Sequence, residues 1–108
     1  MLEVLFGSRT AEQVLMVLHV FESGYASSIA GRFEISLSMV QKQLNKFEEG
    51  GILVSRKMGR TRMYEWNPRY AFMEELRSLL QRNLDYLPDS IRDRYYKGRS
   101  RPRRRGKP

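Results

Sequence analysis

The sequence predicts a mainly helical domain that carries one two-stranded β-hairpin. Apolar residues recur every three or four positions in the segments 8–22, 36–49 and 72–87, which is the spacing of one buried helix face. Over 52–67 apolar and polar residues alternate instead, as they do in a half-buried pair of strands. The 108 residues, 41% of them hydrophobic, suffice for one core and one domain.

The first helix is predicted over 8–22. Ser8 suits its N-cap, and the pair Ser23-Gly24 ends it. Its apolar residues share one face, so Glu12 and Glu22 are expected on the opposite, solvent-facing side.

A short helix over 26–33 and a longer one beginning after Ser36 are predicted next. Ser36 is the expected N-cap of the longer helix, and Gly50-Gly51 ends it. Its core face repeats at spacings of four and three, while its opposite face is polar and mildly basic. That opposite face carries Ser38, Met39, Gln41, Lys42, Asn45 and Lys46.

The predicted hairpin spans 52–67 and turns around Gly59-Arg60. Its tip, residues 56–62, contains four positive charges and no acid. The members with phosphate-binding potential are Arg56, Lys57, Arg60, Thr61 and Arg62.

The last predicted helix, over 72–87, has an apolar stripe that is wider than a three-helix core with a hairpin needs. The stripe consists of Phe72, Met73, Leu76, Leu80, Leu84 and Leu87. Two interpretations remain open: the stripe closes the core of one chain, or it forms the interface of a homodimer.

The excess positive charge lies at the C-terminal end. Residues 92–108 contain nine basic residues and one acid, whereas residues 1–91 contain 11 of each and are neutral. We therefore divide the chain into a folded domain, 1–91, and a basic tail, 92–108. The tail has like charges with Gly and Pro and little to bury, so we expect it to be disordered and to attract polyanions.

Composition excludes several classes of function. Without cysteine the chain has no disulfide or thiolate metal site, and the single histidine, His19, cannot form a metal cluster, so neither a metal nor a cofactor is expected. No nucleophile-base pair or phosphate-binding loop can be assembled, so an enzyme is not expected. Apolar runs are far shorter than the roughly 20 residues that span a bilayer, and no signal peptide is evident. We expect a cytoplasmic, nucleoid-associated protein.

Two helices joined by a tight turn and followed by a hairpin form the pattern of a winged helix-turn-helix. The segment 27–68 resembles that of bacterial and archaeal regulators of the ArsR and MarR kind. The residues that carry the resemblance are Ala30, Ile35-Ser36, Val40, Leu44, the run Phe47-Glu48-Glu49-Gly50-Gly51-Ile52-Leu53, and the closing Tyr64-x-Trp66-Asn67-Pro68. One departure is Glu34, where the turn often has Gly, so this residue must tolerate an unusual backbone angle or the turn must differ.

The resemblance implies a dimeric regulator that binds double-stranded DNA, with repression as the default. Base readout would fall to Ser38, Met39, Gln41, Lys42 and Asn45, and phosphate contact to Lys46 and the hairpin tip. The final helix would pair with its twofold mate. A pocket that binds an organic effector and is lined by aromatic residues is an alternative that the sequence leaves open. The alternative function is a winged helix that binds protein or RNA, with the arginine-rich tail providing nonspecific nucleic-acid affinity.

Overall fold

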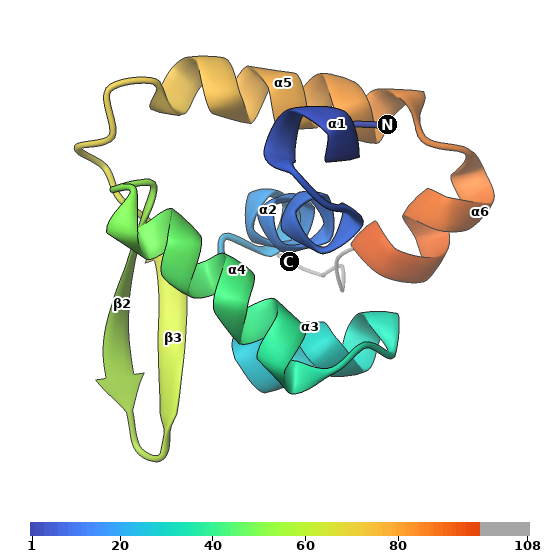
Figure 1. Ribbon diagram of the computed structural model, residues 1–108. Helices are drawn as coiled ribbons and strands as arrows, with labels where there is room; N and C mark the ends of the chain where they lie inside the picture. Colours follow the sequence, from blue (N-terminus) through green and yellow to red (C-terminus); the bar gives the residue numbers. More distant parts are fainter. Residues whose placement is uncertain (98–108) are drawn as a thin grey trace, which may run out of the picture.

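The computed structural model describes residues 1–97, which fold as a helical body with a small antiparallel sheet (Figure 1). In chain order the elements are α1 (Glu3–Phe6), α2 (Arg9–Phe21), β1 (Ser23–Tyr25), α3 (Ala26–Phe33), α4 (Leu37–Glu49), β2 (Leu53–Met58), β3 (Thr61–Trp66), α5 (Met73–Tyr86), α6 (Asp89–Ile91) and the π-helical turn η1 (Arg92–Tyr96). Within these residues, no helix is long and apolar enough to span a membrane.

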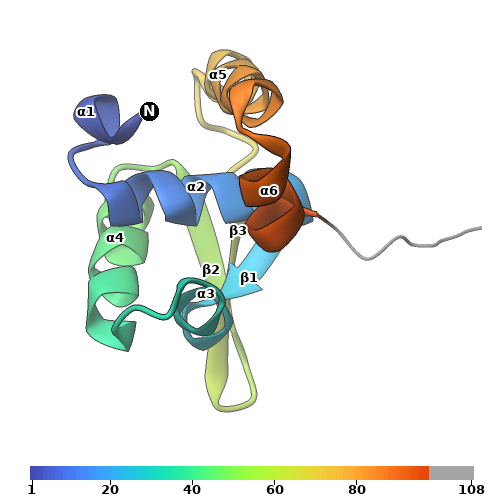
Figure 2. The same cartoon turned by 90° about the vertical axis from the view of Figure 1, so that its right-hand side faces the viewer.

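Helix α2 is the centre of the body. Figure 2 shows it crossing between α1, α4 and α6, with α5 above it. It starts at Ser8, whose Oγ accepts a hydrogen bond from Ala11 N at 3.0 Å, as the sequence predicts for an N-cap. Val14, Leu15 and Leu18 are at most 1% exposed, so they supply the middle of the core.

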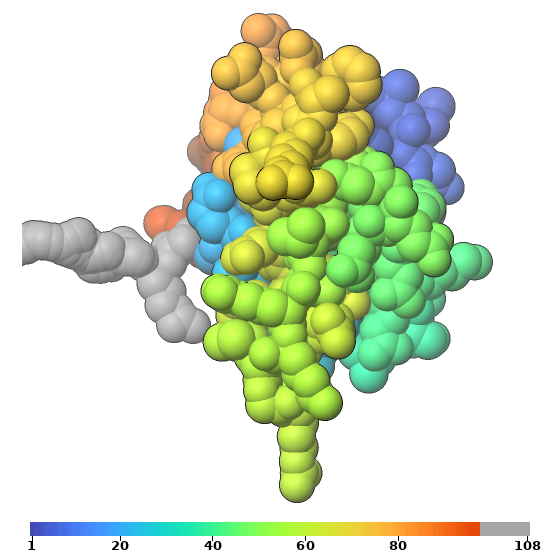
Figure 3. Space-filling view, turned by 90° about the vertical axis from the view of Figure 1, so that its left-hand side faces the viewer, coloured from blue at the N-terminus to red at the C-terminus, as the bar shows by residue number. Residues whose placement is uncertain are grey.

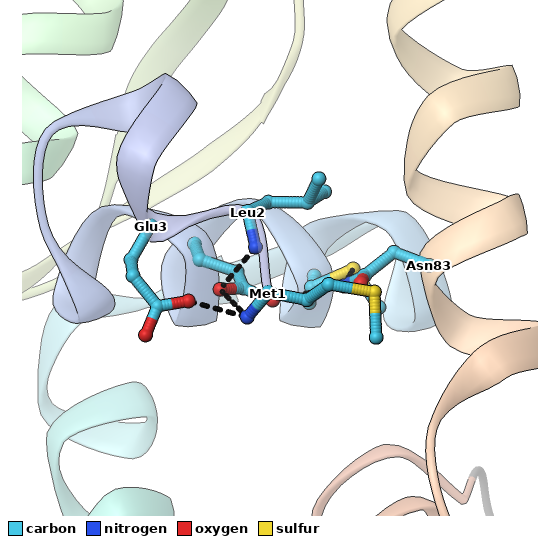
Figure 4. A network of polar contacts seen from close by, with 6 residues as sticks. Met1, Leu2, Glu3 and Asn83 are labelled. Carbon is cyan, nitrogen blue, oxygen red and sulfur yellow. Dashed lines mark hydrogen bonds and ion pairs between the residues drawn. The ribbon is translucent and has the colours of Figure 1, made fainter.

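The prediction that Glu12 faces solvent is wrong: this residue is only 8% exposed. The N-terminal segment and α5 cover the side of α2 on which it lies (Figure 4). Its carboxylate accepts hydrogen bonds from Leu2 N at 3.0 Å and from Asn83 Nδ2 at 2.9 Å. Since a buried carboxylate is costly unless it is hydrogen-bonded, these donors allow α1 and α5 to pack there.

The sheet has three strands in the order β1-β3-β2, whereas the sequence predicts two. β2 and β3 form the expected hairpin, which runs from the pair Leu53↔Trp66 to the pair Met58↔Thr61. β1 pairs with the base of β3, from Ser23↔Glu65 to Tyr25↔Met63. β1 could not be predicted from the sequence because this strand has only three residues and includes the Ser-Gly pair that marks the end of α2.

Arg77 joins α5 to the end of α2. Its Nε donates to His19 Nδ1 at 2.8 Å, and its guanidinium bonds both carboxylate oxygens of Glu22. The same guanidinium lies 5.0 Å from the centre of the Trp66 ring in β3. Arg77 therefore fixes α5, the sheet and the C-terminus of α2 relative to one another.

The packed body extends past the predicted boundary at Ile91. Tyr96 of η1 is 7% exposed and belongs to the core, and burial raises the pKa of its phenol above the usual range. The segment predicted to be a tail therefore begins with a helical turn whose last two residues, Tyr95 and Tyr96, pack on the body. The predicted disorder of the segment from residue 98 onward lies outside the described residues.

The apolar stripe of α5 packs mostly within its own chain. Leu80 is completely buried, and Leu76, Leu84 and Leu87 are partly buried against the same core. Leu80 therefore offers no surface to a second copy. The exposed apolar residues of this region are Phe72, just before α5, and Leu79 and Tyr86 within it.

We expect Leu80→Ala to lower the free energy of unfolding by about 2–5 kcal/mol, because it leaves a cavity in a closed part of the core. Urea denaturation followed by circular dichroism measures this change. The matched control is Leu37→Ala, a leucine that is 45% exposed at the start of α4 and should cost less than about 1 kcal/mol. Equal losses in the two variants would contradict the position of α5 described above.

Candidate nucleic-acid interface

Helices α3 and α4 are joined by a turn that places Glu34 in the left-handed region, with φ 57° and ψ 46°. The backbone N–H of Ile35 donates to Ala30 O at 3.1 Å, and Ser36 Oγ then caps α4 by accepting from Met39 N at 3.2 Å. Glu34 thus adopts the conformation for which glycine is preferred, at a cost of about 1–2 kcal/mol. The tight helix-turn-helix is retained without a glycine.

The outer face of α4 is open to solvent, as its sequence pattern predicts. Val40, Leu44 and Phe47 hold the helix against the core. Each of the six side chains assigned to the opposite face is exposed: Ser38, Met39, Gln41, Lys42, Asn45 and Lys46.

Three of these six hydrogen-bond within the protein, the first being Ser38, whose Oγ lies 3.3 Å from Ser36 Oγ. Lys46 Nζ donates to the carbonyl oxygen of Phe6, the last residue of α1, at 3.1 Å. Asn45 Oδ1 accepts from the hydroxyl of Tyr64 in β3 at 3.4 Å. Lys46 therefore ties α4 to α1, and the amide of Asn45 has its nitrogen free to donate outward while its oxygen faces the sheet.

The hairpin carries the basic residues that the sequence assigns to it. Arg56, Lys57, Arg60 and Arg62 are all exposed, and the hairpin projects beyond the rest of the body (Figure 3). Gly59 takes φ 65° at the turn, where Thr61 Oγ1 donates to Met58 O at 2.9 Å. A two-residue turn of this kind matches the twist of the strands that it joins.

A hydroxyl of β2 connects α4 to the hairpin. Ser55 Oγ donates to Glu48 Oε2 at 2.7 Å and accepts from Arg62 Nη1 at 3.2 Å. Ser55 therefore holds Arg62 near the helix, although sequence reasoning gave Ser55 and Glu48 no part in the site. The contact between Ser55 and Glu48 depends on the angle between α4 and β2, which cannot be predicted from the residue spacing within either element.

An open groove of about 370 Å³ lies between α4, the start of α3 and the hairpin. Gln41 lines one wall, and Lys57, Arg60 and Arg62 line another. Sequence reasoning missed the remaining contributors, which are Tyr25, Ala26, Ser27, Leu37 and Tyr64. Burial raises the pKa of the Tyr64 phenol, so this side chain stays neutral at the base of the hairpin.

The groove has three cations and no carboxylate in its lining, so it suits an extended polyanion. Among residues 1–97, no group of three or more His, Asp or Glu side chains is arranged to hold a metal ion. Both ring nitrogens of His19 are engaged, since Nε2 lies 2.8 Å from Gln81 Oε1 and Nδ1 accepts from Arg77.

We expect Ser55→Ala to lower the free energy of unfolding by about 1–2 kcal/mol, because Glu48 and Arg62 both lose a partner. In a double-mutant cycle with Glu48→Gln, the coupling should be about 0.5 kcal/mol or more. The control Ser78→Ala changes an exposed serine of α5 and should cost less than about 0.5 kcal/mol. Additive effects of the Ser55 and Glu48 substitutions would show that this connection does not contribute.

Several solved structures share this fold. Reduced HlyU from Vibrio cholerae superposes with a TM-score of 0.61 at 18% identity, over 81% of this chain and 86% of HlyU. A MarR-family transcriptional regulator from Rhodococcus gives 0.54 at 16% identity, over 84% and 71%. A variant of ZitR from Lactococcus lactis, solved in complex with DNA, gives 0.50 at 21% identity, over 80% and 66%.

Neither the protein-family models nor the curated protein sequences contain a match to this chain. At these identities the structural likeness concerns the fold. The predicted fold class, a mainly helical winged helix-turn-helix domain, is confirmed, with β1 as a third strand beside the predicted two. The chain has the winged helix-turn-helix fold, in which α3 and α4 form the helix-turn-helix and β2 and β3 form the wing.

Proposed function

We propose that this protein is a sequence-specific regulator of transcription that binds double-stranded DNA. The observation that carries the proposal is the groove in which the exposed face of α4 and the basic hairpin meet. A helix with free polar side chains can enter the major groove, while cations beside it contact phosphates. A solved ZitR variant with the same fold is bound to DNA, which supports this use of the fold.

Individual side chains on the exposed face of α4 are assigned different base contacts. Gln41 offers a donor and an acceptor, which pair with adenine, and Met39 can contact a thymine methyl group. Lys42 and Ser38 complete the reading face, whereas Asn45 contributes through its amide nitrogen. No arginine lies on this face to read guanine, so we expect an AT-leaning site.

The hairpin residues that we assign to phosphate contacts are Arg56, Lys57, Arg60, Thr61 and Arg62. Ser55 supports it by orienting Arg62. Lys46 can reach DNA only if it releases Phe6 O, so we assign it a lesser part. We propose a repressor that occludes a promoter and acts at the nucleoid in the cytoplasm.

We further propose that the regulator is a homodimer that pairs through α5. Phe72, Leu79 and Tyr86 are exposed and lie seven residues apart, which places them on one side of the helix. An antiparallel twofold pairing centred on Leu79 would set Phe72 of each copy against Tyr86 of the other. The same register brings Glu75 near Arg82 of the second copy, so the surface is complementary to itself.

The proposed function is tested by selecting duplexes from a randomised pool and measuring binding by fluorescence anisotropy. We expect one AT-leaning sequence to bind at least about a thousandfold more tightly than scrambled DNA at matched salt. Steep salt dependence without sequence preference would favour the alternative, a winged helix that binds RNA or protein and holds DNA only through charge.

On the selected site, Gln41→Ala and Lys42→Ala should each cost about 1–3 kcal/mol for every base contact that is lost, with little change on random DNA. Arg60→Ala and Arg62→Ala should weaken binding to both the selected site and random DNA. Each should also reduce the slope of log affinity against log salt concentration by about 1. Anisotropy across a salt series measures both effects, and each pair is the control for the other. Indistinguishable behaviour of the two pairs would contradict the division between reading and clamping.

Sedimentation equilibrium tests the dimer. Arg82→Glu should weaken association because it faces Glu75 of the second copy with a like charge, and Glu75→Arg added to it should restore association. Arg69→Glu makes the same charge change in the loop before α5 and should have no effect. A monomer in the unsubstituted protein, or failure of the double variant to recover, would refute this pairing.

A further inference from the structure

The single histidine of the chain lies where α2, α5 and the hairpin meet. His19 belongs to the last turn of α2, and Arg77 and Gln81 approach it from α5. His19 and Arg77 are partly buried, so the imidazole is held by its neighbours and is still within reach of water. We call His19, Glu22, Arg77 and Gln81 the α2–α5 joint.

The hydrogen bonds of the joint fix the protonation state of the imidazole. A guanidinium has donors and no acceptor, so the 2.8 Å contact between Arg77 Nε and His19 Nδ1 requires a lone pair on Nδ1. His19 Nε2 lies 2.8 Å from Gln81 Oε1 and therefore carries the proton. Gln81 Nε2 donates to Asp85 Oδ1 at 2.9 Å, which keeps the amide oxygen turned toward the ring. The joint thus accommodates a neutral imidazole with its proton on Nε2.

A second proton on the ring is incompatible with this arrangement. It would bind Nδ1, so two N–H donors would face each other and a second cation would lie beside Arg77. The charged groups around the pair are Arg77 and Asp85 of α5 and Glu22 at the end of α2, while β3 presents only the uncharged ring of Trp66. Both carboxylates accept bonds from Arg77 or Gln81, and neither can replace the acceptor that Arg77 Nε loses. Protonation therefore separates His19 from Arg77.

The position of Arg77 matters to both surfaces with proposed roles. Its guanidinium lies 5.0 Å from the centre of the Trp66 ring, and Trp66 Nε1 donates to Leu18 O at 3.0 Å. Trp66 ends β3 and pairs with Leu53 at the base of the hairpin. In a dimer paired through α5, the placement of α5 on the body sets the distance between the two DNA-binding faces. Release of Arg77 would loosen that placement and the hairpin base together.

We propose that His19 is a proton sensor: protonation of its Nδ1 releases Arg77, loosens α5 from the base of the hairpin and weakens binding to DNA. Histidine is the side chain whose charge changes between about pH 5 and pH 8, so the effect appears between neutral and mildly acidic conditions. Release of Arg77 depends on the joint alone, whereas the effect on DNA rests on the proposed DNA-binding dimer. Because coupling is reciprocal, bound DNA favours the neutral imidazole.

The single histidine gives nuclear magnetic resonance one unambiguous probe. Long-range proton–nitrogen correlation spectra of the full chain report which ring nitrogen of His19 carries the proton. We expect the Nε2–H form at about pH 7.5, and on lowering to about pH 5.5 the Nε–H signal of Arg77 should shift with the same midpoint as the imidazole. A proton on Nδ1 at the higher pH, or an Arg77 signal that does not follow the titration, would overturn the inference.

Fluorescence anisotropy on the selected duplex, at one salt concentration, tests the effect on DNA. Affinity should be at least about fivefold weaker at about pH 5.5 than at about pH 7.5. His19→Asn is the matched control: its carboxamide oxygen can take the place of Nδ1 as acceptor for Arg77 and does not titrate. This variant should bind as the unsubstituted protein does at the higher pH and should lose the pH dependence. Arg77→Gln lacks the contact throughout and should bind weakly at both pH values.

Equal affinities of the unsubstituted protein at the two pH values, or a pH dependence that persists in His19→Asn, would refute the proton sensor. Failure of the proposed function has a different signature, because no duplex would then be selected at neutral pH. The resonance titration uses no DNA, so it tests the release of Arg77 in either case.

Discussion

Helix α2 is buried, and most of the other elements are positioned by packing against it. α1, α4, α5, β1 and η1 all contact this helix, so the two surfaces with proposed roles, α4 and α5, are positioned by it from different sides. Each fully buried aliphatic residue contributes about 1.5–3 kcal/mol through the hydrophobic effect. This packing buries most of Glu12, and the N–H groups of Leu2 and Asn83 donate hydrogen bonds to its carboxylate. A helix that is amphipathic in sequence thus becomes the interior of the domain.

Much of this fold could be predicted because its main elements follow local rules. Helical spacing locates α2, α4 and α5, and serine caps fix two of their starts. The rest depends on contacts between distant segments. β1 forms because β3 passes beside it, and Tyr96 is buried because η1 packs against α2 and against Phe33 of α3. Periodicity likewise shows that α5 is apolar on more than one side, but it does not tell which side meets the core.

For the interface, the sequence predicts which residues are exposed but not how they are held. Glu48 bonds Ser55 on the hairpin side of α4, and Lys46 bonds Phe6 on the other side. A helix fastened on both flanks loses little freedom when it enters a groove, which lowers the entropic cost of binding. Lys46 also joins α1 to the exposed face of α4 through one hydrogen bond.

The short strand β1 divides the hairpin into two mechanical parts. Near the body β3 has a neighbour on each edge, from Met63 to Glu65, whereas beyond Arg62 only two strands remain. Backbone hydrogen bonds at the base are shielded by the core, and those at the tip face water. Amide hydrogen exchange should therefore be slow at the base and fast around Gly59. For the proposed DNA-binding function, a rigid base would keep the distance to α4 constant, while a flexible tip would let the arginines adapt to the width of the DNA groove.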